Sequence, residues 1–174
     1  MKILHSTMSF VLLVACAICV GQTTGPSAKQ TKTETTSTMH AKGPFDVKLS
    51  PQPSPELPQG VIARMSIDKT FHGELEGTSK GEMLASGSGG KGSSGGYVAL
   101  EQVTGTLNGH MGTFVLQHSA TMTHGVPDLS IIVVPGSGTD QLAGLSGKMN
   151  IIITEGKHSY DFEYTLPEAS PGAH

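Results

Sequence analysis

Residues 113–122 read Thr-Phe-Val-Leu-Gln-His-Ser-Ala-Thr-Met, and their alternation decides the fold class. Phe114, Leu116 and Ala120 fall on one side of an extended chain, and mostly polar residues fall on the other. Because successive side chains of a strand point to opposite faces, this period of two predicts an antiparallel strand with one buried face. His118 is the ionisable residue on the apolar side, so we expect it to point inward.

The same period recurs on either side of this stretch. Residues 61–71 and 158–166 alternate in the same way, with Lys69 as an exception on the apolar side of the first. The runs 129–134 and 149–154 are β-branched and apolar on both faces, and no apolar stripe at helical spacing follows Gly21. About eight such strands, spaced by turns, predict an all-β barrel or sandwich.

Glycine, proline and asparagine mark the expected connections. Asn108-Gly109 predicts a tight hairpin turn. Residues 86–96 are glycine or serine except Lys91, which indicates a long hairpin loop. Ser50–Pro58 carries four prolines and is expected to be an extended connection after a short first strand, Phe45–Leu49.

Composition excludes some classes of function. The chain has 174 residues, of which 14% are charged, with 23 glycines and no tryptophan. Its 11 basic residues, Arg64 being the one arginine, are outnumbered by 14 acidic residues. This balance argues against a nucleic-acid partner, which would require a basic surface.

The N-terminal segment is typical of export. Lys2 precedes an apolar run at residues 10–20, so residues 1–21 are predicted to be a cleaved signal peptide of a secreted or periplasmic protein. The alternative is a lipoprotein, since residues 13–16 read Leu-Val-Ala-Cys, and membrane attachment is expected only if Cys16 is lipidated. Residues 22–44 are rich in threonine and are expected to form a disordered tether, and residues 168–174 a disordered tail.

Three segments resemble the DUF3224 family of small bacterial proteins. They are residues 69–79, residues 112–119 and, most specifically, residues 133–147, which read Val-Val-Pro-Gly-Ser-Gly-Thr-Asp-Gln-Leu-Ala-Gly-Leu-Ser-Gly. The resemblance implies a closed antiparallel eight-stranded barrel, similar to allene oxide cyclase and calycin-like, over residues 45–167. It implies no particular activity, since none is attached to the family.

The candidate ligand-binding residues are His118, Glu101, Gln117 and Tyr164. An inward His118 would act as a general base or orient a ligand, or else be a core residue satisfied by a hydrogen bond. Glu101 lies on a mixed strand face, and we expect it to be an ordinary surface carboxylate. If it points inward instead, burial would raise its pKa. Gln117 falls on the opposite face from His118, and Tyr164 is expected to be a core aromatic whose hydroxyl reaches a partner or the barrel mouth.

Three functions follow from a small barrel with these residues. The favoured one is an exported protein that binds a small apolar or amphipathic molecule inside the barrel, without enzymatic activity. The alternatives are an isomerase or cyclase acting on a lipid-like or polyketide-like substrate, and a structural module with a filled interior. No cofactor and no metal are expected, because His118 and His124 are too far apart for one ion. The apolar runs Ile131–Val134 and Ile151–Ile153 are candidate surfaces for a homodimer.

Overall fold

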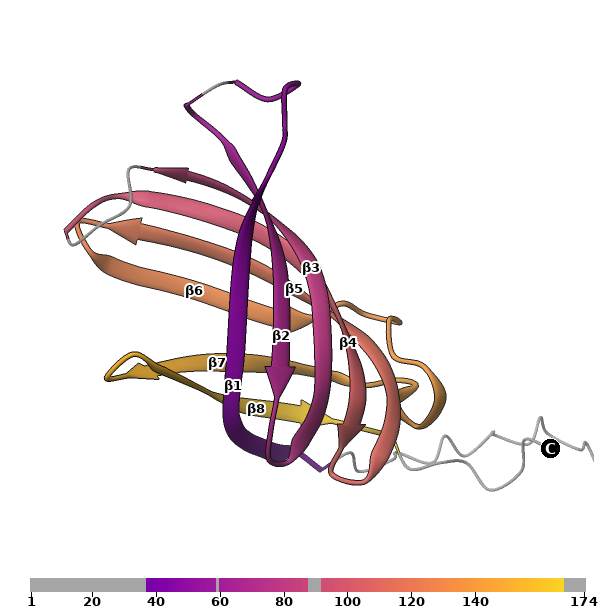
Figure 1. The fold of residues 1–174 in the computed structure, drawn as a ribbon. Helices are drawn as coiled ribbons and strands as arrows, with labels where there is room; N and C mark the ends of the chain where they lie inside the picture. The colour runs from indigo at the N-terminus through magenta and orange to yellow at the C-terminus, as the bar shows by residue number, and fades with distance from the viewer. Residues whose placement is uncertain (1–36, 59, 88–91, 168–174) are drawn as a thin grey trace, which may run out of the picture. The chain divides into compact units, whose positions relative to one another are not determined.

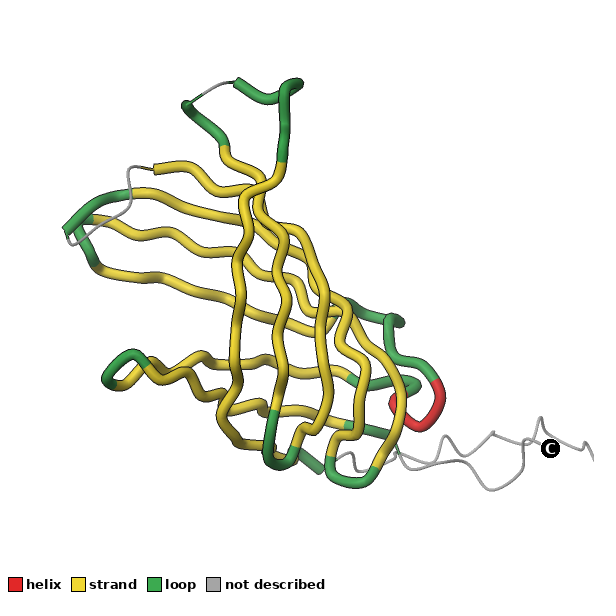
Figure 2. Tube along the Cα trace, viewed as in Figure 1, coloured by secondary structure: helices red, strands yellow, loops and turns green. Residues whose placement is uncertain are grey.

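The computed structural model describes residues 37–58, 60–87 and 92–167. Within these ranges the chain forms eight strands and one short 3-10 helix. The elements are β1 (Met39–Gln52), β2 (Ala63–Phe71), β3 (Leu75–Gly87), β4 (Gly95–Leu107), β5 (His110–Thr123), β6 (Val126–Val133), η1 (Asp140–Leu142), β7 (Ser146–Thr154) and β8 (Lys157–Thr165). The strands pair antiparallel in chain order, and β8 returns to β1, which confirms the predicted closed barrel (Figures 1 and 2).

Two-residue turns set the register of three strand pairs. Asn108-Gly109 joins β4 to β5 as predicted, with φ of 46° and 86°. His124-Gly125 and Glu155-Gly156 join β5 to β6 and β7 to β8, again with positive φ at both residues. Turns of this kind match the twist of the strands that they connect. Each turn therefore fixes which residues of its two strands lie opposite each other.

Strand β1 is longer at both ends than the sequence predicted. Residues 39–44, which we assigned to the tether, pair with β8, because the partner strand supplies hydrogen bonds that composition does not reveal. The rest of the tether, the signal peptide and the tail lie outside the described residues. Ser50, Pro51 and Gln52 also belong to β1 and pair with β2. Beyond Pro44 this strand has no β8 partner, and a proline is tolerated at such an edge.

The glycine–serine loop is shorter than predicted. Strand β3 runs to Gly87 and β4 begins at Gly95, so both strands extend into the stretch that we assigned to the loop. Gly87 pairs with Gly95 and Ser86 with Gly96. Small side chains do not prevent strand pairing when the adjacent register is already fixed.

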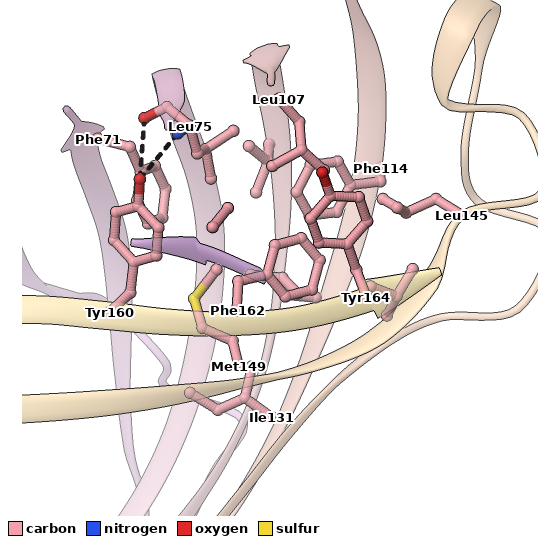
Figure 3. Close-up of a cluster of buried hydrophobic side chains, with 14 of the residues drawn as sticks. Phe71, Leu75, Leu107, Phe114, Ile131, Leu145, Met149, Tyr160, Phe162 and Tyr164 are labelled. Carbon is pink, nitrogen blue, oxygen red and sulfur yellow. Dashed lines mark hydrogen bonds between the residues drawn. The ribbon is translucent and has the colours of Figure 1, made fainter. Parts of the chain in front are cut away.

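The apolar core fills one end of the barrel. Its largest side chains include Phe71, Phe114, Phe162 and Tyr164 (Figure 3). The short helix η1 contributes Leu142. Phe114 and Phe162 stack with their ring centroids 5.8 Å apart, and Phe162 and Tyr164 stack at 5.3 Å. This end carries the β2–β3 and β4–β5 turns, and we call it the packed end.

A buried tyrosine hydroxyl ties the packed end together. The N–H of Leu75 donates to Tyr160 Oη at 2.8 Å, and this hydroxyl donates to the carbonyl of His72 at 3.0 Å. Tyr160 also accounts for the glycine at position 43, since a Cβ there would lie too close to the His72 carbonyl and to Tyr160 Oη. Gly43 falls in the stretch that we assigned to the tether, whereas close packing within the barrel explains this glycine.

The pairing of β6 with β7 is the shortest in the barrel. One residue pair, Ile132 with Lys148, joins them, whereas β7 and β8 pair along their whole length. The two strands diverge away from this point, as Figures 1 and 2 show. Residues 126–131 of β6 therefore pair with β5 alone.

The two runs that we suggested for a homodimer alternate between inside and outside. Ile131 and Val133 are buried in the core, so they cannot contribute to an outer surface. Ile132 and Ile152 are exposed on the outer face, whereas Ile153 is exposed at the open end of the interior, where it lines two pockets. Any outer surface that these runs offer to a second copy is therefore limited to every other residue.

Candidate functional site

A buried charged cluster lies inside the barrel. It consists of Lys69 on β2, Ser79 on β3, Glu101 on β4 and His118 on β5, each at most 5% exposed. Lys69 Nζ donates to Glu101 Oε1 at 2.7 Å, and His118 Nε2 lies 3.0 Å from the same oxygen. Ser79 Oγ donates to the other carboxylate oxygen, Oε2, at 3.0 Å. Glu101 is thus the centre of the cluster.

Strand register brings these side chains together. Lys69 lies directly opposite Ser79, and Glu101 lies opposite Gly81 two residues further along β3. A Cβ at Gly81 would collide with the Cβ of Glu101 and with the carbonyl oxygen of Leu100. The glycine therefore leaves the space that Glu101 occupies, and the carboxylate reaches diagonally to Lys69 and Ser79.

The surroundings of Glu101 keep it ionised. Burial by itself raises the pKa of this carboxyl, but the hydrogen bond from His118 and the charge of Lys69 outweigh burial and hold the pKa below its ordinary value. An ionised carboxylate only accepts hydrogen bonds. His118 must therefore carry a proton on Nε2 and donate it to Glu101, as Lys69 and Ser79 also donate.

The second ring nitrogen of His118, Nδ1, is left without a protein partner in the described part of the chain. In the same part of the chain, every fully buried side-chain nitrogen and oxygen has a hydrogen-bond partner. Nδ1 is therefore not fully enclosed. When the ring is neutral, Nδ1 presents a lone pair, since Nε2 holds the proton.

A cavity of about 340 Å³ borders this cluster. The polar residues of its wall are Lys69, Tyr97, His118 and His158. Most of the remaining wall is apolar, and it includes Val47, Ile67, Met83, Leu129 and Ile151. Lys69 Nζ also lies 5.3 Å from the ring centroid of Phe45, which is part of the same wall. The cavity is thus apolar along most of its surface, with polar residues at the cluster and at Tyr97 and His158.

A second cavity of about 480 Å³ adjoins the first and shares Tyr97, Leu129 and Ile153 with it. Its other lining residues include Ala63, Ala85 and Met122, at the ends of β2, β3 and β5 that are remote from the packed end. We call this end the mouth. The interior is therefore filled with side chains at one end and hollow at the other.

Tyr97 lies beside the cluster without a hydrogen bond of its own in the described residues. Its ring centroid is 6.4 Å from that of His118. Burial raises the pKa of the Tyr97 hydroxyl, and the negative charge of Glu101 raises it further. The hydroxyl is therefore protonated near neutral pH and available to a ligand.

Of the four predicted site residues, the structure places His118 and Glu101 in the buried cluster and Gln117 and Tyr164 elsewhere. His118 points inward, as the alternation predicted. The expectation for Glu101 was wrong: it is 1% exposed rather than on the surface, because its charge is balanced by Lys69 from another strand. The conditional expectation of a raised pKa for an inward Glu101 was also wrong, because these partners outweigh the effect of burial.

Gln117 and Tyr164 lie away from the cavity. Gln117 is exposed on the outer face of β5, as its position beside His118 predicted. Tyr164 is 2% exposed at the packed end, and its hydroxyl accepts a hydrogen bond from Asn108 Nδ2 at 2.9 Å. Tyr164 therefore fixes the β4–β5 turn and does not line either cavity.

Sequence reasoning missed Lys69, Ser79 and Tyr97 as site residues. The signal for Lys69 is its charge on the apolar side of a strand with a period of two. Ser79 follows the inward positions Leu75 and Gly77 at the same spacing. Nothing in the sequence places these residues beside Glu101, because register between strands depends on pairing.

The described residues contain no helix long and apolar enough to cross a membrane. In the same ranges no group of three or more His, Asp or Glu side chains is arranged to hold a metal ion. The Lys69–Glu101–His118 cluster has only two such groups, and a cation already occupies one carboxylate oxygen.

The fold and the site define a small antiparallel barrel with a buried ion pair beside an interior cavity. The family model described as "Protein of unknown function (DUF3224)" matches residues 41–164, and the chain belongs to this family. A crystal structure of a protein of unknown function from the DUF3224 family of Shewanella oneidensis MR-1 is similar, with 47% sequence identity and a TM-score of 0.70. The match covers 76% of this chain and 100% of that chain. A search of curated proteins finds no match.

Proposed function

We propose that this barrel binds one small amphipathic molecule in its interior. The observation that carries the proposal is the cavity of about 340 Å³, whose wall is apolar except for Lys69, Tyr97, His118 and His158. A filled barrel would leave no room larger than a water molecule. Binding pockets for small molecules have this composition, with a mostly apolar wall and a few convergent polar groups.

The polar groups indicate how the bound ligand is oriented in the cavity. Lys69 and Tyr97 can donate hydrogen bonds, and His118 Nδ1 can accept one. The mouth is lined by small and apolar side chains such as Ala85 and Met122. A ligand with its oxygen atoms near the cluster and its apolar body toward the mouth satisfies both regions.

The experiment is displacement of a neutral fluorophore, N-phenyl-naphthylamine, from the purified protein. Met83→Trp places a large side chain in the cavity wall, whereas Leu84→Trp places the same side chain on the outer face of β3. We expect Met83→Trp to weaken binding at least tenfold, about 1.4 kcal/mol, and Leu84→Trp to leave it unchanged. Equal affinity in the two variants would place the fluorophore outside the cavity and overturn the proposal.

We also propose that the protein is exported and that residues 1–21 are removed. The support is the charged start at Lys2 and the apolar run at residues 10–20. Intact-mass measurement of the protein from a native host should give a chain that lacks this segment. A chain that retains Met1, or one with a lipid on Cys16, would contradict cleavage after Gly21.

A further inference from the structure

We propose that the cavity catalyses proton transfer at the carbon next to a ligand's carbonyl group, with His118 as the base and Lys69 as the hydrogen-bond donor to the carbonyl oxygen. This inference rests on the proposed binding function and adds an activity to it. It depends on the cluster geometry, because both groups contact the same oxygen of Glu101 and both line the cavity.

The contact with Glu101 determines which nitrogen of His118 is left to act as a base. Glu101 accepts the Nε2 proton, which fixes the ring orientation and leaves Nδ1 as the basic atom. The resulting imidazolium would lie beside a carboxylate, which stabilises it as the proton arrives. Histidine is the side chain used most often for such transfers, because its ordinary pKa lies near neutral pH.

Lys69 supplies the complementary group. Its ammonium uses one N–H for Glu101, and no other hydrogen bond to Nζ occurs among the described residues. A lysine ammonium has three N–H donors, so two remain for a ligand oxygen. A fixed donor at the oxygen where negative charge develops lowers the barrier to enolate formation.

The reaction balances without a further reactant. His118 Nδ1 takes the proton from the α-carbon, and the C–H electron pair forms the new carbon–carbon double bond. The carbonyl π electrons move to oxygen, where Lys69 N–H stabilises the enolate. Return of a proton from His118 to carbon regenerates the carbonyl compound, so a proton exchanged with solvent on Nδ1 enters the ligand.

The site selects the chemical class of the substrate. The positive charge of Lys69 is balanced by Glu101, and the cavity wall contains no other lysine or arginine. A substrate carboxylate at this end would therefore lie close to Glu101 without a cation of its own. The substrate class is an uncharged ketone or aldehyde with an apolar body.

The test is deuterium incorporation into benzylacetone, an uncharged aryl ketone, in heavy water at neutral pH. Proton NMR follows loss of the signals next to the carbonyl, and ligand-observed NMR measures binding in the same samples. We expect the full chain to accelerate exchange at least tenfold over His118→Gln, whose amide can still donate to Glu101 but is not a base. His110→Gln, the same change at an exposed histidine of β5, should exchange like the unmodified protein.

The outcomes separate the activity from binding. Benzylacetone that binds but exchanges equally fast with the unmodified protein and His118→Gln would overturn the proposed activity and leave the binding function intact. Failure of benzylacetone to bind at millimolar concentration would count against both. In Lys69→Met/Glu101→Gln, which removes the donor and its counter-charge together, exchange should fall at least tenfold while His118 remains. Unchanged exchange there would overturn the role of Lys69.

Discussion

Replacing Glu101 with glutamine tests whether the buried ion pair is as isolated from solvent as its geometry indicates. Glutamine keeps the size of the side chain and can still accept from His118 and bond to Ser79. The variant therefore loses one feature, the negative charge opposite Lys69, which is 5% exposed. Removing one partner of a buried ion pair costs about 3–5 kcal/mol, because the other charge remains buried and unpaired.

An independent limit gives a similar magnitude. Deprotonating an ordinary lysine ammonium at pH 7 costs about 4.6 kcal/mol. An unpaired Lys69 could lose its proton at this cost, so the decrease in the free energy of unfolding of Glu101→Gln should not exceed about 4.6 kcal/mol. For a domain of this size, a loss of 3–4 kcal/mol lowers the melting temperature by roughly 10–20 °C. The expected loss becomes smaller as the pH rises, since lysine is then neutralised more easily.

The assay is urea unfolding at pH 7, followed by circular dichroism. The matched control is Asp68→Asn, because Asp68 on β2 pairs with Lys80 on β3 at 2.7 Å on the exposed outer face of the barrel. That exposed pair is expected to contribute less than about 1 kcal/mol. Adding Lys69→Met to Glu101→Gln should recover at least about 2 kcal/mol, since it removes the unpaired charge.

Two results would refute this reasoning. A loss within about 1 kcal/mol for Glu101→Gln, equal to that of the exposed control, would mean that water reaches Lys69 freely. A double variant less stable than Glu101→Gln alone would mean that Lys69 stabilises the barrel mainly through the Phe45 and Phe71 rings, whose centroids lie 5.3 and 5.7 Å from its Nζ.

Three further predictions concern the rest of the barrel. Tyr160→Phe should lower the free energy of unfolding by about 1–3 kcal/mol in urea, because the buried N–H of Leu75 loses its partner. A decrease of less than about 0.5 kcal/mol would contradict this. Acidification should reduce the free energy of unfolding, because folding lowers the pKa of Glu101 and so favours its ionised form. The loss should begin as the pH falls through the ordinary pKa of an unfolded glutamate and end below the lower pKa of native Glu101. This acid-dependent loss should be smaller in Glu101→Gln, and an unchanged profile would argue against it. Asn108→Ala should slow or weaken formation of the β4–β5 hairpin by about 1 kcal/mol or more, because alanine disfavours the positive φ and cannot bond to Tyr164; hydrogen exchange of His110 and Leu107 amides would detect the change, and unaltered exchange would contradict it.

The sequence predicted the barrel because its information is local. A period of two identifies a strand, and an Asn-Gly pair identifies a tight turn, without knowledge of distant residues. The same local rule placed His118 inward. It failed for residues 39–44, which look like a loop but gain their hydrogen bonds from β8 at the other end of the domain.

The site was only partly predictable because its central interaction is not local. Glu101 resembled a surface carboxylate on a mixed strand face, and Lys69 resembled an exception to an apolar pattern. Each residue explains the other, since a charge can be buried at low cost only beside its counter-charge. Two opposite charges at inward positions of different strands are a signal that can be sought in other barrel sequences.

The pairing of Met39 with Tyr164 places the first and last strands side by side at the packed end. The chain therefore enters and leaves the described barrel at the packed end, and the mouth faces away from both of these points. An affinity tag or an immobilising surface joined ahead of Met39 or behind Thr165 should not obstruct entry of a guest molecule. A sensor or a display fusion made from this domain would keep the mouth accessible whether the fusion partner is joined before β1 or after β8.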